Sequence, residues 1–542
     1  MMWLKTKNPQ STQNHELESK RDPQQTESNS STQDEEIKYP GLKVVIPVTF
    51  SLCLACFLVA LDRIIISVAV PTISNQFNSF DDIAWYESAY LLTYATLQLP
   101  KGRAYTFFPA KWIFLATIVI FEIGSIVCAA APNSSAFIIG RAIAGIGSAG
   151  TTTGSTVIFV DLLPLEKRAA YQGFLGATFG LASIAGPLLG GVFTSKITWR
   201  WCFWINLPVG GHALLLMIFI LPLKPALREH VGKSSIDRVW QFDPIGTAIL
   251  IPGLILLLLG LQWGGSESWR STKVIVTLIS GIILLVAFAI SQIFIGENGT
   301  IPPRIICQRS IAAATAVSLG FGSTLVIITF YLPLWYQAIT GLSAVDAGVR
   351  MIGYFLVTVV FVIAGGLLVF KAGYYTPVLI VGTALTVVGC GLFTTFRTNT
   401  STARSIGYQV VIGAGLGLSL PQSNNAAQTV LSRKDIPIGI TLIQFANQIG
   451  GTIFVSVCQG VLQSTLSTQL GQSIPGFDAS AISHAGASDL AKLVPEEQLP
   501  ALLEAYNKGI DDVFYCALAV ACLAFVASWF LKWKSVKKQP QA

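Results

Sequence analysis

The sequence predicts an all-α membrane protein, and three observations lead to this fold class. Only 12% of the 542 residues are charged, whereas a typical soluble domain has about 25%. The mean hydropathy is +0.62. The apolar residues form long unbroken runs, near the roughly 20 residues that a helix needs to cross a bilayer. These features exclude a disordered chain and argue against a soluble enzyme. The runs do not alternate with a period of two, which excludes an outer-membrane barrel.

The chain begins with a polar segment. Residues 1–42 are rich in Ser, Thr, Gln, Glu and Lys and cannot bury enough apolar surface to offset their ordering entropy, so we expect a disordered tail. No apolar core follows the first basic residues, so we do not expect a signal peptide. The tail is therefore predicted to lie in the cytosol, with residues 532–542 as a second cytosolic tail.

The apolar runs between these tails are interpreted as fourteen spans. Residues 44–222 hold six of them, residues 244–295 hold two linking spans, and residues 311–531 hold the last six. Two long loops are expected, a cytosolic one at 223–243 and an extracellular one at 464–512. The predicted spans are 44–70, 85–105, 112–131, 137–160, 170–193, 201–222, 244–263, 274–295, 311–336, 350–370, 376–396, 405–427, 438–463 and 513–531.

The distribution of Lys and Arg orients this arrangement. An even number of spans places both termini on one side, and a cytosolic assignment gives the inner loops and tails the larger share of basic residues. The net charge of +7 then reflects topology and does not suggest a nucleic-acid partner. We expect a multi-pass protein of the plasma membrane, with a vacuolar or vesicular membrane as the alternative. The sequon at Asn399 falls in an outer loop, so glycosylation is expected there.

Two pairs of segments suggest an internal repeat. Gly140 to Gly147 in the fourth span matches Gly407 to Gly417 in the twelfth, and Gly186 to Gly191 in the fifth matches Asn447 to Gly451 in the thirteenth. The offset of eight spans fits two six-helix halves with two extra spans between them. Paired halves around a central site are a transporter architecture.

Charged residues inside the predicted spans are functional candidates, because burying a charge in a membrane is costly. A carboxylate facing a cavity can bind and release a proton, and Asp62 and Glu122 are the candidates for this role. Arg141 stays protonated and can influence a nearby carboxylate or orient a polar substrate group. It can equally be a structural partner. Arg63 points about 100° away from Asp62 around a helix and is left without a role.

Glycines suggest a mechanical role for the fifth span. Gly180, Gly186, Gly190 and Gly191 leave a smooth helix face that lets a neighbour approach and slide, and Pro187 favours a kink. Ordinary tight packing is the alternative. Gly145 and Gly147 mark the corresponding surface of the fourth span.

Amides and aromatic residues in other spans are candidates for the substrate path, because large amphipathic ligands suit cavities of aromatic faces with few polar groups. Each of them can equally satisfy a neighbouring helix. The candidates are Tyr90, Tyr94, Gln98, Trp335, Gln422, Asn425, Gln444, Asn447 and Gln448. The histidines do not cluster, and most cysteines lie in or beside apolar runs, so no metal site is expected. No cofactor is expected either, and the proton gradient is the predicted source of energy.

Four segments together resemble the major facilitator superfamily: Ala60 to Pro71, which centres on Leu61-Asp62, Gly140-Arg141 to Gly147, Gly180 to Gly191, and Trp199 to Pro208. The resemblance is to its fourteen-span drug:proton antiporters, and the general appearance is that of fungal pumps for toxins and secondary metabolites. It implies export of small hydrophobic molecules driven by proton influx, with Asp62 as the coupling acid and Arg141 as its partner.

The loop between the second and third spans departs from that pattern. Thr106 stands where the family has an acid, and Pro109 stands where it has its second glycine. The inner gate that depends on this acid is therefore expected to be altered.

The functional prediction is a proton-coupled efflux transporter, acting as a monomer on a small hydrophobic substrate within the lipid bilayer. A proton-coupled importer of the same topology, such as a siderophore carrier, is the alternative. A nutrient receptor is less favoured, because a receptor of this fold is expected to carry a long signalling tail and the predicted tail is residues 532–542. A membrane enzyme is less favoured, because no nucleophile–base constellation or phosphate loop is visible. The protein is thus not expected to be an enzyme.

Overall fold

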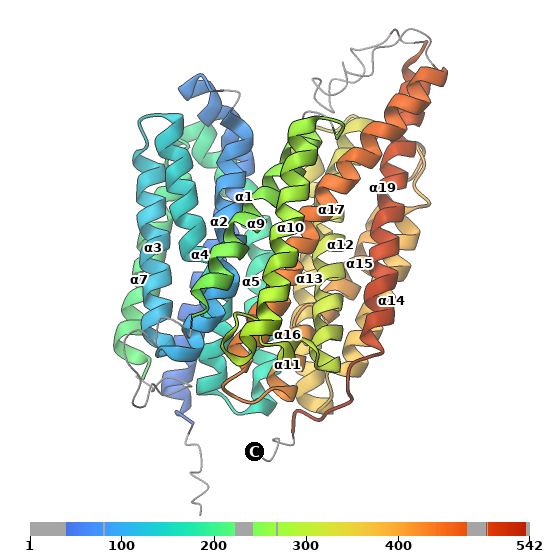
Figure 1. Ribbon diagram of the computed structural model, residues 1–542. Coiled ribbons are helices and arrows are strands. Elements are labelled where there is room, and N and C mark those ends of the chain that lie inside the picture. The colour runs from blue at the N-terminus through green and yellow to red at the C-terminus, as the bar shows by residue number, and fades with distance from the viewer. Residues whose placement is uncertain are drawn as a thin grey trace, which may run out of the picture. The chain divides into compact units, whose positions relative to one another are not determined.

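The computed structural model describes residues 39–79, 82–222, 242–266, 269–473, 495 and 497–537. The expected tail at 1–42, the loop at 223–243 and the tail at 532–542 lie wholly or partly outside these ranges. The chain divides into the units Met1–Tyr39 and Pro40–Ala542. The second unit holds the helices, which make up its regular structure (Figure 1).

The first group of helices is called the N-terminal set. Asn133 begins α4 by accepting a hydrogen bond from the Ala136 backbone N–H at 2.9 Å, which satisfies one of the unpaired donors at a helix start. Pro109 and Pro164 precede α3 and α5, where their missing N–H costs nothing. The set comprises α1 (Leu42–Phe77), α2 (Ile83–Phe107), α3 (Ala110–Ala130), α4 (Ser134–Leu162), α5 (Leu165–Val192), α6 (Trp201–Trp204) and α7 (Asn206–Ile220).

The next two helices form a pair that we call the linking hairpin: α9 (Pro244–Ser266) and α10 (Thr272–Ile295) pack against each other. The short helices η3 (Gly296–Asn298) and α11 (Pro303–Ile306) lead onward. The C-terminal set then comprises α12 (Arg309–Thr340), α13 (Ala344–Ala372), α14 (Thr376–Phe393), α15 (Thr402–Ser419), α16 (Gln422–Val430), α17 (Ile436–Ser473) and α19 (Leu499–Ser528).

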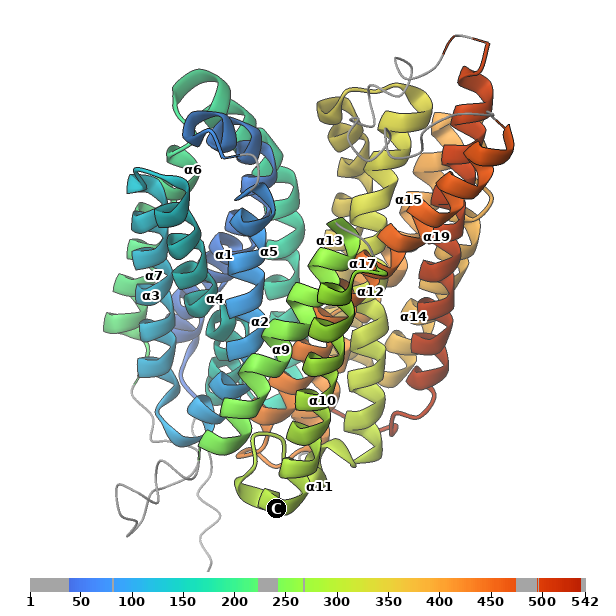
Figure 2. The same cartoon turned by 45° about the horizontal axis from the view of Figure 1, so that its top comes forward.

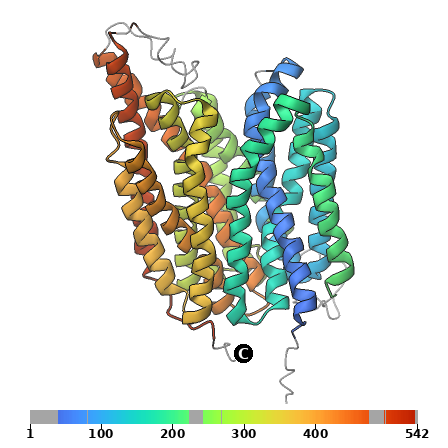
Figure 3. The same ribbon diagram turned by 180° about the vertical axis from the view of Figure 1, so that it is seen from behind.

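The two sets repeat one packing scheme. In the N-terminal set α1 packs on α5 and α7, while α4 packs on α2 and α3; in the C-terminal set α12 packs on α17 and α19, while α15 packs on α13 and α14. The sets meet where α5 contacts α13 and where α2 contacts α17. Figure 3 shows the first of these contacts, with α5 in teal beside α13 in yellow. This reciprocal pattern is what the internal repeat predicts.

Twelve helices of the described residues are long and apolar enough to cross a membrane, against the fourteen spans expected. The two others correspond to α2 and to α15 with α16. These helices are more polar because their polar groups find partners inside the bundle. The Tyr105 hydroxyl of α2 donates to the Gly150 carbonyl at 2.9 Å, and Gln409 of α15 donates to the Tyr336 hydroxyl at 2.7 Å.

The segment 464–512, expected to be a loop, is helical at both ends. α17 continues to Ser473 and α19 begins at Leu499. Leu466 and Leu470 of α17 and Leu502 of α19 are buried in one apolar cluster. This leucine packing extends both helices beyond their most apolar stretches.

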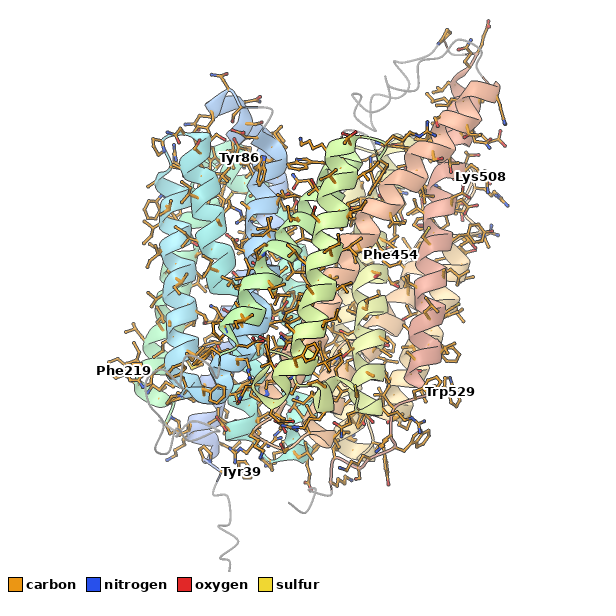
Figure 4. The ribbon with its side chains drawn as sticks, viewed as in Figure 1. Tyr39, Tyr86, Phe219, Phe454, Lys508 and Trp529 are labelled. Carbon is orange, nitrogen blue, oxygen red and sulfur yellow. The ribbon has the colours of Figure 1, made fainter. Side chains whose placement is uncertain are left out.

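The bundle has a lower and an upper end, defined by the view in Figure 4. Phe219 and Trp529 lie at the lower end, and Tyr86 and Lys508 lie toward the upper end. Large apolar side chains such as Phe219 and Phe294 are 81% and 85% exposed. An outer surface of this kind is expected where lipid replaces water as the solvent. Figure 2 shows the linking hairpin in front of the junction between the two sets.

Candidate functional site

A buried ion pair lies inside the N-terminal set. The Arg141 guanidinium of α4 donates to the Asp62 carboxylate of α1 at 2.6 Å, and neither side chain has any exposed surface. Desolvating two charges is costly unless their geometry and hydrogen bonds compensate. The sequence predicted both residues as a pair, and the structure brings them together.

Further hydrogen bonds hold the pair. The Arg141 Nε–H donates to the Tyr86 carbonyl at 2.9 Å. Asn206, the first residue of α7, directs its amide toward the other Asp62 oxygen at 3.4 Å and donates to the Ser125 hydroxyl at 3.0 Å. Four helices thus converge on one carboxylate and one guanidinium.

Aromatic rings cover the guanidinium on one side. The Arg141 guanidinium carbon lies 4.5 Å from the centre of the Tyr90 ring, a separation at which cation–π attraction is favourable. Tyr94 stacks on Tyr90 with ring centres 6.2 Å apart, and Arg63 lies 5.7 Å from the centre of the Tyr94 ring. Arg63 therefore contacts an aromatic residue of α2, whereas its neighbour Asp62 faces Arg141.

Glu122 lies on α3 one turn from Ser125. Its side chain is 8% exposed, and neither carboxylate oxygen has a hydrogen-bond partner among the described residues. It faces Gly210 of α7 so closely that a β-carbon there would collide with the carboxyl group. Asn206, which contacts Asp62, is one turn from Gly210 on α7. Glu122 therefore lies about one helical turn from the ion pair along α7.

The glycines of α5 form two separate contact surfaces. A β-carbon at Gly186 would lie 2.6 Å from Ile64 Cγ2, and one at Gly190 would lie 3.1 Å from Ile65 Cγ1. These isoleucines lie within one turn of Asp62 on α1. Gly180, in the other part of α5, instead faces Val359 of α13.

The remaining motif residues take different positions. Pro187 is accommodated within α5, whereas a β-carbon at Gly191 would meet nothing within 4 Å. Gly145 and Gly147 of α4 allow close approach of α2 and α3, respectively, since their β-carbons would collide with the Tyr90 carbonyl and with Phe121. The predicted smooth face therefore includes Gly186 and Gly190 but not Gly191.

The substrate-path candidates do not form one cluster. Gln444 of α17 accepts a hydrogen bond from Thr153 of α4 at 2.8 Å, which joins the two sets. Gln98 of α2 is buried, and neither polar atom of its side chain has a partner among the described residues. Tyr90 and Tyr94 belong to the ion-pair site.

The other candidates lie in the C-terminal set. Trp335 is buried there and donates to Asn507 of α19 at 2.8 Å. Asn425 donates to Gln422 at 2.9 Å, and Asn447 donates to the Ser318 carbonyl at 3.3 Å. Gln448 is half-buried on α17. Trp335 in particular satisfies a neighbouring helix, the alternative that the sequence left open.

Sequence reasoning missed several groups at the site. Asn206 appeared only as part of a motif, and nothing indicated that it reaches Asp62. The Tyr86 carbonyl carries no sequence signal, because every residue has one. No group of three potential metal ligands occurs among the described residues. The arrangement joins α1, α2, α4 and α7 through one buried ion pair and its hydrogen bonds.

Comparisons with known proteins identify the class. Residues 52–455 match the Major Facilitator Superfamily, so the chain belongs to this family of membrane transporters. The fold agrees: the crystal structure of the human organic anion transporter MFSD10 superposes with a TM-score of 0.57 at 14% identity, covering 88% of this chain and 99% of that one. The predicted fold class and the prediction of a transporter, not an enzyme, are confirmed.

Similar sequences occur in fungi. The chain is 45% identical over 499 residues to the MFS-type efflux pump MFS1 of Arthroderma benhamiae, covering 92% of each chain. It is 41% identical over 507 residues to the rubrofusarin-specific efflux pump aurT of Gibberella zeae, covering 93% of this chain and 92% of that protein. The predicted resemblance to fungal efflux pumps of this superfamily is thereby confirmed.

Proposed function

We propose that the protein is a proton-coupled exporter of small hydrophobic toxins, drugs or secondary metabolites. The buried Asp62–Arg141 pair carries this proposal, because its carboxylate sits where protonation would remove the charge that holds Arg141. The names of the fungal relatives, which are efflux pumps, support the direction of transport. The Gly186–Pro187 segment of α5, which resembles the antiporter motif, favours export as well.

Proton exchange at Asp62 is the proposed coupling step. While Asp62 is ionised it accepts from Arg141 and Asn206, and these contacts hold α1, α4 and α7 together. A proton on Asp62 weakens the attraction and leaves Arg141 with the Tyr86 carbonyl and the Tyr90 ring. Glu122 is a second proposed proton carrier, since its buried carboxylate lacks partners among the described residues.

The glycine face of α5 is the proposed mechanical link. Gly186 and Gly190 contact α1 within one turn of Asp62, and Gly180 contacts α13 of the other set. A shift of α1 on protonation can therefore be passed to the junction between the sets. Alternating access results if the two sets rock about this junction, as in other transporters with paired repeats.

Further features of the proposal concern topology. We assign fourteen spans by counting α2 and the α15–α16 pair with the twelve apolar helices. We place the lower end in the cytosol and the protein in the plasma membrane as a monomer. Basic residues support this orientation. Lys43 stands in the first turn of α1, Lys371 in the last turn of α13, Lys434 just before α17, and Lys532, Lys534 and Lys537 follow α19. These helix ends lie at the lower end.

A transport assay tests the proposal. The protein is expressed in a drug-sensitive yeast that lacks its own pumps, and accumulation of a panel of toxic hydrophobic compounds is measured. We expect reduced accumulation of at least one compound, reversed by a protonophore and absent in the Asp62→Asn variant. Unchanged accumulation across the panel with the protein at the cell surface contradicts export. Uptake of a labelled ferric siderophore would favour the importer instead.

A further inference from the structure

Three contacts close the lower end between the two sets. Arg433, which precedes α17, donates to Asp161 at the end of α4 at 2.7 Å. Thr153 of α4 and Gln444 of α17 are joined by their 2.8 Å hydrogen bond. The first turns of α17 also press on α2, where a β-carbon at Gly102 would lie 2.5 Å from Thr441 Oγ1. The start of α17 is therefore one part of the C-terminal set that seals this end, beside the contact of α13 with α5.

The ion pair is weak by itself. The Arg433 and Asp161 side chains are 35% and 15% exposed, and ion pairs near the surface contribute little because ordering long side chains costs entropy. The contacts around the turn that carries Arg433 therefore matter for its position.

Asp435 anchors the turn that carries Arg433. Its side chain is 2% exposed and accepts two hydrogen bonds from Arg304, each 2.8 Å long. The Ser432 hydroxyl also donates to it, and the Asp435 backbone N–H donates to the Ser432 carbonyl at 2.8 Å. A two-pronged guanidinium–carboxylate contact fixes orientation as well as distance. Arg304 thereby sets the position of the turn at 432–435.

Arg304 is in turn fixed to the linking hairpin. Its Nε–H donates to the Glu297 carboxylate at 2.7 Å, and Glu297 lies in η3 directly after α10. The pairing of Arg304 with both acids raises its pKa above the usual arginine value, so it keeps its charge at every accessible pH.

The hairpin is itself closed at this end by a buried acid. Asp243, which precedes α9, accepts from Gln292 of α10 at 2.7 Å and from the Thr300 backbone N–H at 2.8 Å. These bonds join the start of α9, the end of α10 and the segment after η3. The contact of Arg304 with Glu297 therefore attaches α17 to a braced pair of helices.

The hairpin also touches both sets through apolar contacts. Leu250 and Leu254 of α9 share a buried cluster with Leu99 of α2, against which Phe445 of α17 packs. Arg103 of α2 reaches the Glu297 carbonyl at 3.5 Å, a long contact. The hairpin thus spans the lower junction, and through Glu297 and Arg304 it is also linked to the turn before α17.

We propose that Arg304 is a positioning residue for closure of the lower end. It holds Asp435 so that Arg433 reaches Asp161, and through Glu297 it makes the linking hairpin part of the closing machinery. The inference goes beyond the proposed function, because it concerns how the two sets close whatever the substrate.

Cross-linking between the sets tests this role. Thr153→Cys and Gln444→Cys are introduced together in a Cys307→Ser background, since Cys307 is exposed, and disulfide formation is measured by mass spectrometry in lipid nanodiscs. We expect Arg304→Gln to slow cross-linking by about fivefold, the scale of an exposed ion pair, and Asp161→Asn to do the same. The variant that combines both changes should be no slower than either alone, because both act through one contact.

Matched variants show whether Arg304→Gln changes the position of Arg433 or loosens the whole protein. Arg309→Gln removes a nearby arginine that donates to the Phe530 carbonyl instead and should leave cross-linking unchanged. A second cysteine pair at Thr465 and Asp512, which touch within the C-terminal set, should react at the parental rate in Arg304→Gln. Glu297→Gln, at an exposed position, should slow cross-linking between the sets in the same direction.

Specific results would overturn the proposal. Cross-linking at the parental rate in Arg304→Gln would show that Arg304 does not position Arg433. The same conclusion follows if the slowing by Arg304→Gln adds fully to the slowing by Asp161→Asn. Parental cross-linking in Glu297→Gln excludes the hairpin. Because the assay needs neither substrate nor proton gradient, a failure of export in yeast would leave its result standing.

Discussion

Arg141 holds Asp62 at 2.6 Å in a site where neither side chain is exposed, and it holds the Tyr86 carbonyl at the same time. One guanidinium thus connects the acid of α1 to the backbone of α2. The same ion pair also joins α1 to α4, so a change at either of its two side chains acts on three helices.

Asp62→Asn should abolish proton-driven export. Asparagine keeps the shape but cannot take up a proton, and it leaves the buried Arg141 without its counter-charge. Breaking a buried pair costs about 3–5 kcal/mol, so we also expect a lower melting temperature for the purified protein. The measurement is export from proteoliposomes with an imposed pH gradient. Export at the parental rate would remove Asp62 from the mechanism.

Neutralising both partners should separate stability from coupling. In Asp62→Asn/Arg141→Gln no charge stays buried without a partner, so the double variant should regain most of the stability lost in Asp62→Asn. Transport should stay absent, because the titrating acid is gone. Thermal unfolding of the single and double variants in detergent gives the coupling energy. Additive losses of stability would show that the two residues do not act as a pair.

Glu122→Gln tests the second acid. A buried carboxylate whose oxygens find no partner among the described residues costs about 1–3 kcal/mol per unsatisfied group, so the amide should leave stability unchanged or raise it. If Glu122 carries protons, the pH dependence of export should change while the protein stays folded. Gly210→Ala should act similarly, because its β-carbon would displace the carboxyl group. A parental pH profile in both variants would assign Glu122 a structural role.

Most of the fold was predictable because helices that face lipid must carry apolar side chains, and these form long apolar runs in the sequence. α10, with exposed Ile282, Ile293 and Phe294, is apolar along its length and easily recognised. α2 and α15 are less distinct, since the side of a helix that packs on other helices can exchange apolar residues for polar ones. The extensions of α17 and α19 beyond the apolar runs were not predictable either, because they depend on the packing of these helices on each other.

The candidate site was predictable in part for a related reason. A charge in an apolar run stands out, so Asp62, Glu122 and Arg141 could be named from the sequence. Their geometry could not, because Asp62 and Arg141 are 79 residues apart and Asn206 comes from a third region. Arg304 lies in the short helix α11 and Asp435 in the turn before α17. Both stand between the predicted spans, where a charged residue carries no signal, so their contact emerges only from the fold.

Glycosylation at Asn399 is a test of orientation. Asn399 is exposed between α14 and α15, at the end of the bundle opposite the start of α1. If the lower end is cytosolic, treatment with an endoglycosidase should shift the protein on a gel, and Asn399→Gln should abolish the shift. The sequon at Asn298, at the lower end, serves as the control. A shift that depends on Asn298 would reverse the proposed topology.

Gly186→Ala should impair transport through packing, while Gly191→Ala should not. The new β-carbon at Gly186 would lie 2.6 Å from Ile64 Cγ2, whereas the one at Gly191 would meet no atom within 4 Å. Overpacking of this kind costs about 1–3 kcal/mol, and here it would push α5 away from the turn of α1 that carries Asp62. Export and melting temperature are measured for both variants and for Gly186→Ala/Ile64→Ala, which restores the space. Equal losses in the two glycine variants would mean that the motif acts through backbone flexibility and not through contact with α1. Recovery in the double variant would show that Ile64 and Gly186 form the surface through which α1 moves α5.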